Sequence, residues 1–178
     1  MSFKFLNTRL SGLILIERQK YFDKRGYLTE IMNSQSFFKN KVRFKNALIS
    51  KSNKNVLRGF HYQKQKPISQ FVTCIKGEIL DVVVDIRKSS KTFGQHEHVI
   101  LSEKNNLSFF MSEGFAHAFL TLKSNSLILY NNSQDYIKEF DSGFVWNDSF
   151  VNFKWPIKNP ILSERDKNFK DFISEFNL

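Results

Sequence analysis

Residues 70–87 read QFVTCIKGEILDVVVDIR, an apolar run that is long enough for two strands and is interrupted at Lys76-Gly77. Valine, isoleucine and phenylalanine favour extended backbone, and a glycine between two such runs is typical of a tight turn. In the second half of the run, Asp81 and Asp85 bracket three consecutive valines. The stretch therefore predicts two consecutive strands joined at Lys76-Gly77.

Three further segments have the same character, because each is short, rich in strand-forming residues and bounded by Gly, Asn, Ser or Lys. They are GLILIERQ (12–19), HEHVILS (96–102) and NSLILYNNS (125–133). Many short strands at even spacing, without a repeat of 20 to 50 residues, indicate a closed barrel or a jelly roll. No linker or shift in composition divides the chain, so we expect one all-β domain spanning residues 1–178.

Two stretches have helical patterns. One is SQSFFKN (34–40), and the other is the tail from Asp166, where Phe169, Phe172, Ile173 and Phe176 follow the i, i+3, i+4, i+7 spacing of one helix face. An amphipathic tail of this kind must cover either its own barrel or a neighbouring subunit.

The charge balance favours anionic ligands. The chain has 27 Lys and Arg against 17 Asp and Glu, a net charge of +10, which suits phosphates, nucleic acid or a membrane surface. The abundance of Lys, Asn, Ile and Phe also fits AT-rich codon usage. No run of five basic residues and no stretch of 18 apolar residues occurs, so we expect neither nucleic acid nor membrane as partner. The lone Cys74 is typical of a reducing compartment, and we expect a cytoplasmic protein.

The four histidines narrow the search for chemistry. His96 and His98 lie two apart on an expected strand, so they share a face and could chelate a metal. His117 follows a turn glycine, as in the second metal motif of cupins, but no first motif completes it. We therefore expect a site without metal. In VLRGFHYQ (56–63), His61 has the residue type of a base near neutral pH, and Arg58 beside it is suited to binding phosphate.

Six blocks occur in the order and with the spacing of one enzyme family. They are NVLRGFHYQ (55–63), GEILDVVVDIRKSSKTFGQ (77–95), SEGFAHAF (112–119), LILYNNSQDY (127–136), FVWND (144–148) and PILSERD (160–166). Together they make the chain similar to the dTDP-4-dehydrorhamnose 3,5-epimerase family from about residue 13 to residue 166.

The resemblance implies a cupin-type jelly-roll β-barrel, an active site inside the barrel without cofactor or metal, and a homodimer formed by exchanged strands. It also implies epimerisation at C3 and C5, beside the 4-keto group of a nucleotide-linked 6-deoxy sugar. The expected conversion is dTDP-4-dehydro-6-deoxyglucose to dTDP-4-dehydrorhamnose, for lipopolysaccharide, capsule or another surface glycan. Such a reaction needs a base on one side of the sugar ring and an acid on the other.

The family pattern also assigns residues. His61 matches the base, Asp166 the carboxylate that orients its imidazole, and Tyr130 the acid. The positions that bind substrate are matched by Arg25 and Arg58 for the diphosphate, Glu30 and Asn46 for the nucleotide or sugar, His117 for the sugar, and Asp141 and Arg165 for further ligand contacts.

The chain departs from the pattern in two places. Where relatives carry a lysine close to the C4 keto oxygen, this sequence has Gln70, and either Gln70 itself or Lys64 or Lys66 from the preceding loop would take over that role. Ala47 and Leu48 stand where relatives have polar residues, so a base other than thymine is an alternative.

These departures keep other functions open. One is a single-site C3 or C5 epimerase acting on a different nucleotide sugar, for example a GDP-linked deoxyheptose. Another is a non-catalytic cupin that binds a sugar nucleotide, and a third is a metal-dependent cupin enzyme.

Overall fold

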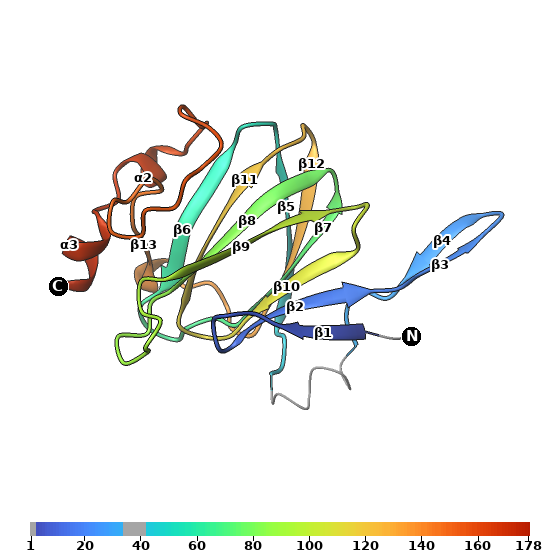
Figure 1. Ribbon diagram of the computed structural model, residues 1–178, viewed down its shortest axis with the longest axis horizontal. Coiled ribbons are helices and arrows are strands. Elements are labelled where there is room, and N and C mark those ends of the chain that lie inside the picture. The colour runs from blue at the N-terminus through green and yellow to red at the C-terminus, as the bar shows by residue number, and fades with distance from the viewer. Residues whose placement is uncertain (1–2, 34–41) are drawn as a thin grey trace.

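The computed structural model describes residues 3–33 and 42–178, which form mostly antiparallel strands (Figure 1). The helix expected at 34–40 lies outside the described residues. The strands are β1 (Phe3–Asn7), β2 (Leu13–Arg18), β3 (Lys20–Asp23), β4 (Gly26–Thr29), β5 (Asn46–Ser52), β6 (Leu57–Gln63), β7 (Gln70–Lys76), β8 (Glu78–Asp85), β9 (His96–Ser102), β10 (Leu107–Met111), β11 (Phe115–Thr121), β12 (Ser126–Asn132) and β13 (Asp141–Gly143). The helical elements are η1 (Lys138–Phe140), α2 (Glu164–Lys167) and α3 (Phe172–Phe176).

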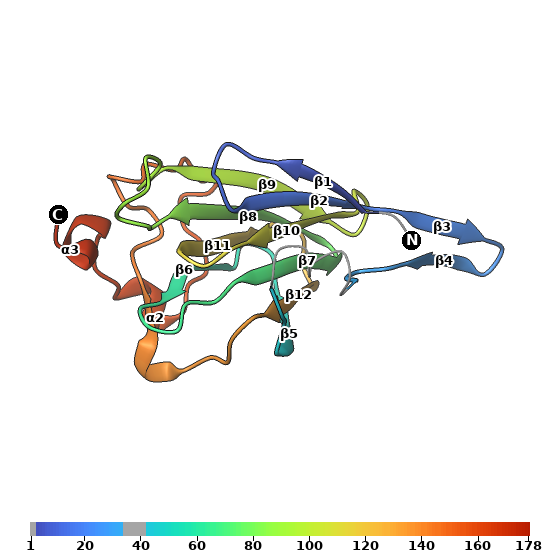
Figure 2. The same ribbon diagram turned by 90° about the horizontal axis from the view of Figure 1, so that it is seen from below.

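Two antiparallel sheets face each other and enclose the main core (Figure 2). One has the strand order β1-β2-β10-β7-β12-β5, and the other has the order β13-β6-β11-β8-β9. The strands of both sheets contribute to one buried cluster that includes Val72, Ile79, Phe109 and Phe119. The expected all-β jelly roll is therefore confirmed.

The run 70–87 connects the two sheets. Its first half is β7, inside one sheet, and its second half is β8, inside the other, so the chain crosses between sheets at Gly77. Gly77 has a φ of +81°, and a Cβ there would lie 2.2 Å from Oγ of Ser126. Only glycine fits this turn, because the position combines a left-handed backbone with close packing.

Strand β8 is predominantly apolar because both of its faces are buried. Ile79 and Val83 point into the core between the sheets. Leu80, Val82 and Val84 belong to a second cluster on the outer face of their sheet, which the C-terminal segment covers. Asp81 alternates with the inward set, so its position in the strand places a carboxylate in the interior of the fold.

The C-terminal tail covers its own barrel, which settles the two alternatives raised by its amphipathic pattern. Phe172 and Phe176 are buried against the outer face of the sheet. The tail is helical as expected, and it forms two short helices. Asn168 ends α2, and the side chain of Asp171 caps the start of α3 by accepting a hydrogen bond from Ser174 N.

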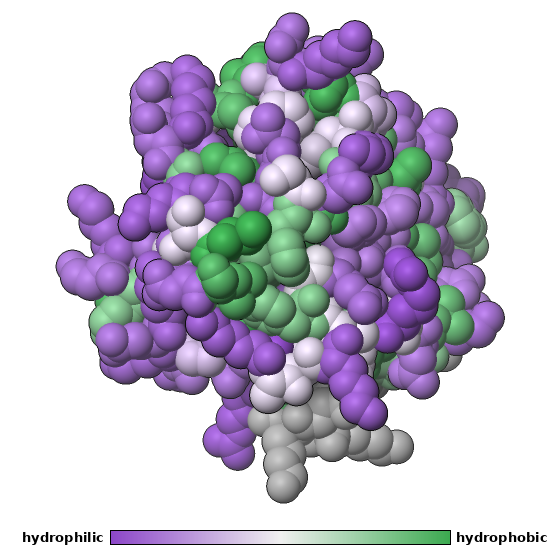
Figure 3. Space-filling view, turned by 60° about the vertical axis from the view of Figure 1, so that its left-hand side comes forward, coloured by the Kyte–Doolittle hydropathy of each residue, from purple (hydrophilic) through white to green (hydrophobic). Residues whose placement is uncertain are grey.

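Seen from the side of this segment, the molecular surface is mostly hydrophilic (Figure 3).

The β3–β4 hairpin projects from the body on the side away from the C-terminal helices (Figures 1 and 2). Its exposed side chains include Phe22 and Leu28, with 75% and 60% of their surface accessible. None of the helices in the described part of the chain has the length and apolar character that crossing a membrane requires.

Candidate active site

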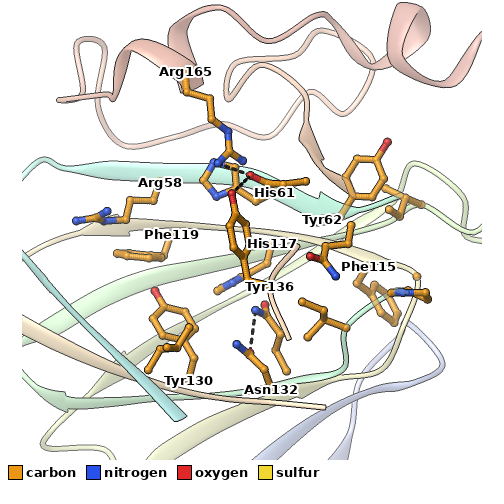
Figure 4. Close-up of a pocket in the computed structure, with 18 residues that line it drawn as sticks. Arg58, His61, Tyr62, Phe115, His117, Phe119, Tyr130, Asn132, Tyr136 and Arg165 are labelled. Atoms are coloured by element: carbon orange, nitrogen blue, oxygen red, sulfur yellow. Dashed lines mark hydrogen bonds and ion pairs between the residues drawn. The ribbon is translucent and has the colours of Figure 1, made fainter. Parts of the chain in front are cut away.

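A cavity of about 260 Å³ opens between the two sheets, with polar side chains on both sides (Figure 4). The sheet that contains β6 and β11 contributes His61 and His117, and the sheet that contains β7 and β12 contributes Gln70 and Tyr130. The other lining residues are Leu48, Arg58, Tyr62, Gln63, Pro67, Ile68, Ile86, Gly114, Phe115, Phe119, Asn132, Tyr136, Asp141 and Arg165.

An irregularity in β6 brings Arg58 and His61 to the same face. Residues three apart on a regular strand point to opposite faces. Here His61 pairs with His117 of β11, whereas Arg58 pairs with Phe119, so three steps along β6 match two along β11. The extra residue forms a β-bulge, which turns both side chains toward the cavity.

Gly59 lies inside this bulge and has a φ of +116°. A Cβ at that position would lie 2.4 Å from the carbonyl oxygen of His117 and 2.6 Å from Cα of Ala118. The glycine therefore allows β6 to approach β11 closely enough to hold His61 beside His117.

His61 forms a short hydrogen bond to Asp166. Its Nε2 lies 2.6 Å from Oδ1 of that carboxylate, which α2 carries across the mouth of the barrel. Burial of Asp166 raises its pKa, but the hydrogen bond and charge interaction with His61 and the hydrogen bond from Ser163 outweigh this effect, and the pKa lies below the ordinary value. An ionised Asp166 accepts from Nε2 and leaves Nδ1 of His61 as the basic nitrogen. The ring of Phe169 packs against the imidazole, with ring centroids 5.8 Å apart.

Tyr130 enters the cavity from the opposite sheet, on β12 (Figure 4). Its hydroxyl lies 3.4 Å from Oγ of Ser50, and its ring centroid is 6.3 Å from that of His117. Burial raises the pKa of the phenol well above its ordinary value, so Tyr130 is protonated at neutral pH. The arrangement thus places an imidazole and a proton-donating phenol on opposite walls of one cavity.

A second histidine–carboxylate pair lies deeper in the site. Nε2 of His117 is 2.8 Å from Oδ2 of Asp81, and both side chains are buried. Asp81 is one of the two aspartates that bracket the three valines, but no role in the site was predicted for it. The signal that could have found it is its inward position in an apolar strand, since a buried carboxylate requires a partner.

The mouth of the cavity carries a cluster that joins three segments. Arg165 of α2 forms an ion pair with Asp141 of β13, and the hydroxyl of Tyr136 donates to Oδ2 of Asp141 at 2.9 Å. The structure thus brings Asp141 and Arg165 together at the cavity, and their contact with a ligand stays a prediction. The cluster also contains Tyr136, for which no role was predicted from the sequence and which lines the cavity near the centre of the view in Figure 4.

Gln70 lines the cavity, whereas Lys64 and Lys66 do not. Gln70 is directly opposite Asn132 in the β7–β12 pairing, and its Nε2 donates to Oδ1 of Asn132 at 3.2 Å. Nζ of Lys64 instead lies 2.9 Å from the carboxylate of Glu175 in α3. Of the three candidates for the role of the family lysine, only Gln70 reaches the site.

Three expected binding residues lie outside the cavity of this chain. Arg25 is at the tip of the β3–β4 hairpin, paired with Asp23 and 84% exposed. The Glu30 carboxylate accepts a hydrogen bond from Asn33, and Nδ2 of Asn46 donates to the backbone oxygen of Gln134 and to the Asp135 carboxylate. Their assignment to the substrate site stays a prediction.

The rings of His96 and His98 lie against Phe153, with centroid distances of 5.1 and 5.3 Å. Within residues 3–33 and 42–178, no group of three or more His, Cys, Asp or Glu side chains is placed to hold a metal ion.

Comparison with known proteins agrees with the fold. The family model described as dTDP-4-dehydrorhamnose 3,5-epimerase matches residues 7–174. A dTDP-6-deoxy-D-glucose-3,5-epimerase from Legionella pneumophila, solved in complex with dTDP-4-keto-L-rhamnose, superposes with a TM-score of 0.93 at 34% identity and covers 99% of this chain and 94% of that one. Fold and pocket thus define a cupin-type sugar isomerase.

Two other relatives extend the comparison. A dTDP-4-dehydrorhamnose 3,5-epimerase from Methanothermobacter thermautotrophicus is 43% identical over 173 residues, 94% of each chain. A 3'-monoepimerase from Streptomyces bikiniensis, solved with dTDP-quinovose, has a TM-score of 0.89 at 28% identity and covers 96% of this chain and 90% of its own. The chain belongs to the dTDP-4-dehydrorhamnose 3,5-epimerase family.

Proposed function

We propose that the protein epimerises C3 and C5 of dTDP-4-dehydro-6-deoxyglucose to give dTDP-4-dehydrorhamnose. The observation that carries this proposal is the placement of His61 and Tyr130 on opposite walls of one cavity. Inversion of a carbon beside a ketone requires removal of a proton from one face and its return on the other.

The roles of the residues follow from their protonation. Nδ1 of neutral His61 takes the proton α to the ketone, and the imidazolium that forms is stabilised by the Asp166 carboxylate. The C–H electrons form a C=C bond and the carbonyl electrons move to oxygen, giving an enolate. Tyr130 then protonates the carbon from the opposite face, and the ketone is restored. Exchange with water returns His61 and Tyr130 to their starting forms.

The size and charge of the cavity support a sugar bound inside and a nucleotide outside. A volume of about 260 Å³ is below the range of about 300–1,000 Å³ of pockets that enclose larger ligands. Arg58 is more exposed than His61 and can pair with the diphosphate as it leaves the cavity. Glu30, Asn46 and the His117–Asp81 pair complete the proposed contacts to nucleotide and sugar.

The projecting hairpin supports a homodimer. Its exposed apolar side chains Phe22 and Leu28 are suited to burial in an interface. Arg25 at its tip has no access to the cavity of its own chain. In the proposed dimer the hairpin packs on the partner subunit and brings Arg25 to the partner's diphosphate site. We propose that this assembly works in the cytoplasm, where nucleotide sugars for surface glycans are made.

A single-site epimerase is the second candidate, favoured by the likeness to the Streptomyces bikiniensis 3'-monoepimerase and by Gln70 in place of the family lysine. A binding protein without catalysis is less well supported, because recognition alone does not require a base and an acid on opposite walls.

Incubation with dTDP-4-dehydro-6-deoxyglucose, followed by proton NMR of the sugar ring, tests the proposal. Inversion at both C3 and C5 supports it, inversion at one carbon supports the single-site candidate, and binding without conversion contradicts both. Thermal shift with dTDP and GDP in parallel reports the nucleotide: stabilisation by GDP alone would contradict the assigned substrate.

A further inference from the structure

An enolate needs a hydrogen-bond donor or a cation at the position of its oxygen, because charge that develops in a low-dielectric cavity is costly when unpaired. Neither His61 nor Tyr130 can meet this need, since both are engaged in proton transfer at carbon. The group that holds the oxygen must lie within reach of the same carbon atoms.

The cations of the cavity are placed elsewhere. Among the described lining residues the only permanently charged cations are Arg58 and Arg165. Arg165 is neutralised by Asp141 at the mouth, and Nε of Arg58 donates to Oγ of Ser52 at 3.2 Å. Lys64 is held outside by Glu175. None of the described lining residues contributed by the sheet of Tyr130 carries an ammonium or guanidinium group.

This wall instead carries two amides. Asn132 follows Tyr130 by two residues on β12, so the two side chains share a face and their Cα atoms are about 7 Å apart. Gln70 lies directly across from Asn132 on β7. Figure 4 shows Asn132 beside Tyr130, on the wall opposite His61.

The hydrogen bond between the amides leaves N–H groups of both residues available to a ligand. Nε2 of Gln70 donates one hydrogen to Oδ1 of Asn132. This contact occupies Oδ1 of Asn132. The Nδ2 group of Asn132 has no partner among the described residues, and the second N–H of Gln70 also remains available as a donor. Both backbones are held on two sides, because β7 pairs with β10 and β12, and β12 pairs with β7 and β5. Donors held in this way are preorganised, as are the hydrogen-bond donors with which enzymes stabilise oxyanions.

We propose that the Gln70–Asn132 amide pair binds the carbonyl oxygen of the sugar and stabilises the enolate, as a neutral oxyanion site. The inference rests on the proposed epimerase function and deepens it, because it names the groups that set the rate of proton abstraction. When His61 removes the α-proton, the negative charge that reaches oxygen is shared by the N–H groups of Asn132 and Gln70.

The test compares Gln70→Leu and Gln70→Glu with the wild type in deuterium exchange of the 4-keto sugar, measuring kcat and KM. Leucine removes the donor, and we expect kcat to fall about 100-fold with KM changed less than about threefold. Glutamate keeps the shape of glutamine and can still accept a hydrogen bond from Asn132, but it puts negative charge beside the enolate. We expect it to be slower than leucine, an order that a purely structural role for Gln70 does not produce.

Gln95→Leu and Gln95→Glu are the matched controls, because Gln95 is exposed and outside the cavity, and both should exchange at the wild-type rate. Thermal melting verifies that each variant is folded, and the glutamate variant carries the test if the leucine variant does not fold. Exchange by a folded Gln70 variant within about threefold of the wild type overturns this inference and leaves the epimerase function intact. If the wild type itself shows no exchange, the epimerase function fails and the inference falls with it.

Discussion

The imidazole of His61 and the carboxylate of Asp166 are 105 residues apart in the sequence and 2.6 Å apart in space. The pair links β6, inside the barrel, to α2, in the tail that closes over it. Replacing Asp166 with asparagine keeps the shape but removes the charge that orients and stabilises the imidazolium. We expect Asp166→Asn to lower kcat by at least about 100-fold with little change in KM. Steady-state kinetics check this, and kcat within a factor of about three of the wild type would contradict the orienting role.

The roles of Tyr130 as acid and His61 as base can be distinguished by isotope exchange. In Tyr130→Phe the base still removes the α-proton, but no acid is present on the opposite face. The histidine then returns a solvent deuteron to the face from which the proton left. We expect deuterated substrate of unchanged configuration and loss of the inverted product. Mass spectrometry and NMR of the recovered sugar distinguish the two, and inverted product at the wild-type rate would show that another group is the acid.

The raised pKa of Tyr130 determines how kcat should depend on alkaline pH. Because burial raises this pKa above the ordinary value of about 10, the phenol stays protonated throughout the neutral and mildly alkaline range. We expect no loss of kcat from ionisation of Tyr130 below about pH 10. A pH profile of kcat on the wild type, with stability followed by circular dichroism, measures this. A basic limb near pH 8 that disappears in Tyr130→Phe would contradict the assignment.

The environment of Asp85 indicates that the free energy of unfolding decreases at acidic pH. Burial raises its pKa, but hydrogen bonds from Arg87, Ser90 and Thr92 outweigh burial and lower the pKa to about 2. A carboxylate with a depressed folded-state pKa stabilises the protein above its unfolded pKa of about 3.9, and this contribution is lost as pH falls from about 4 to about 2. We expect Asp85→Asn to lower the free energy of unfolding by about 2 kcal/mol at pH 7 and to flatten its decline in acid. Urea denaturation at several pH values tests both effects, and equal slopes in the two proteins would refute the assignment.

Gly59 and Gly26 form a matched pair for the bulge in β6. Both have positive φ, but a Cβ at Gly59 meets the backbone of His117 and Ala118, whereas a Cβ at Gly26 has nothing within 4 Å. We expect Gly26→Ala to cost about 1 kcal/mol of backbone strain and Gly59→Ala about 3 kcal/mol or more, because steric overlap is added. Equal losses in urea denaturation would argue against close packing at Gly59.

The strands were predictable because their signals are local. The turn at Gly77 and the strands on either side of it depend on residues adjacent in sequence, and both are confirmed. The pairing of His117 with Asp81 depends on the register of β8 against β11, in which Asp81 is opposite Phe119. A sequence alone does not fix that register, so Asp81 was noticed but not assigned.

The roles of Arg58 and His61 were expected from family resemblance, whereas the bulge that turns both side chains toward the cavity appears only in the strand pairing. The break in the tail was missed for a similar reason. The helical spacing from Phe169 to Phe176 was present, but the capping interactions of Asn168 and Asp171 ended one helix and began another. The position of the β3–β4 hairpin also had no local signal.

The central claim is that His61 abstracts the protons on both sides of the ketone. The most direct test is NMR of dTDP-4-dehydro-6-deoxyglucose incubated with the protein in deuterated water. We expect deuterium at both C3 and C5 with the wild type and at neither carbon with His61→Ala. Exchange at both carbons by a folded His61→Ala variant at the wild-type rate would contradict it.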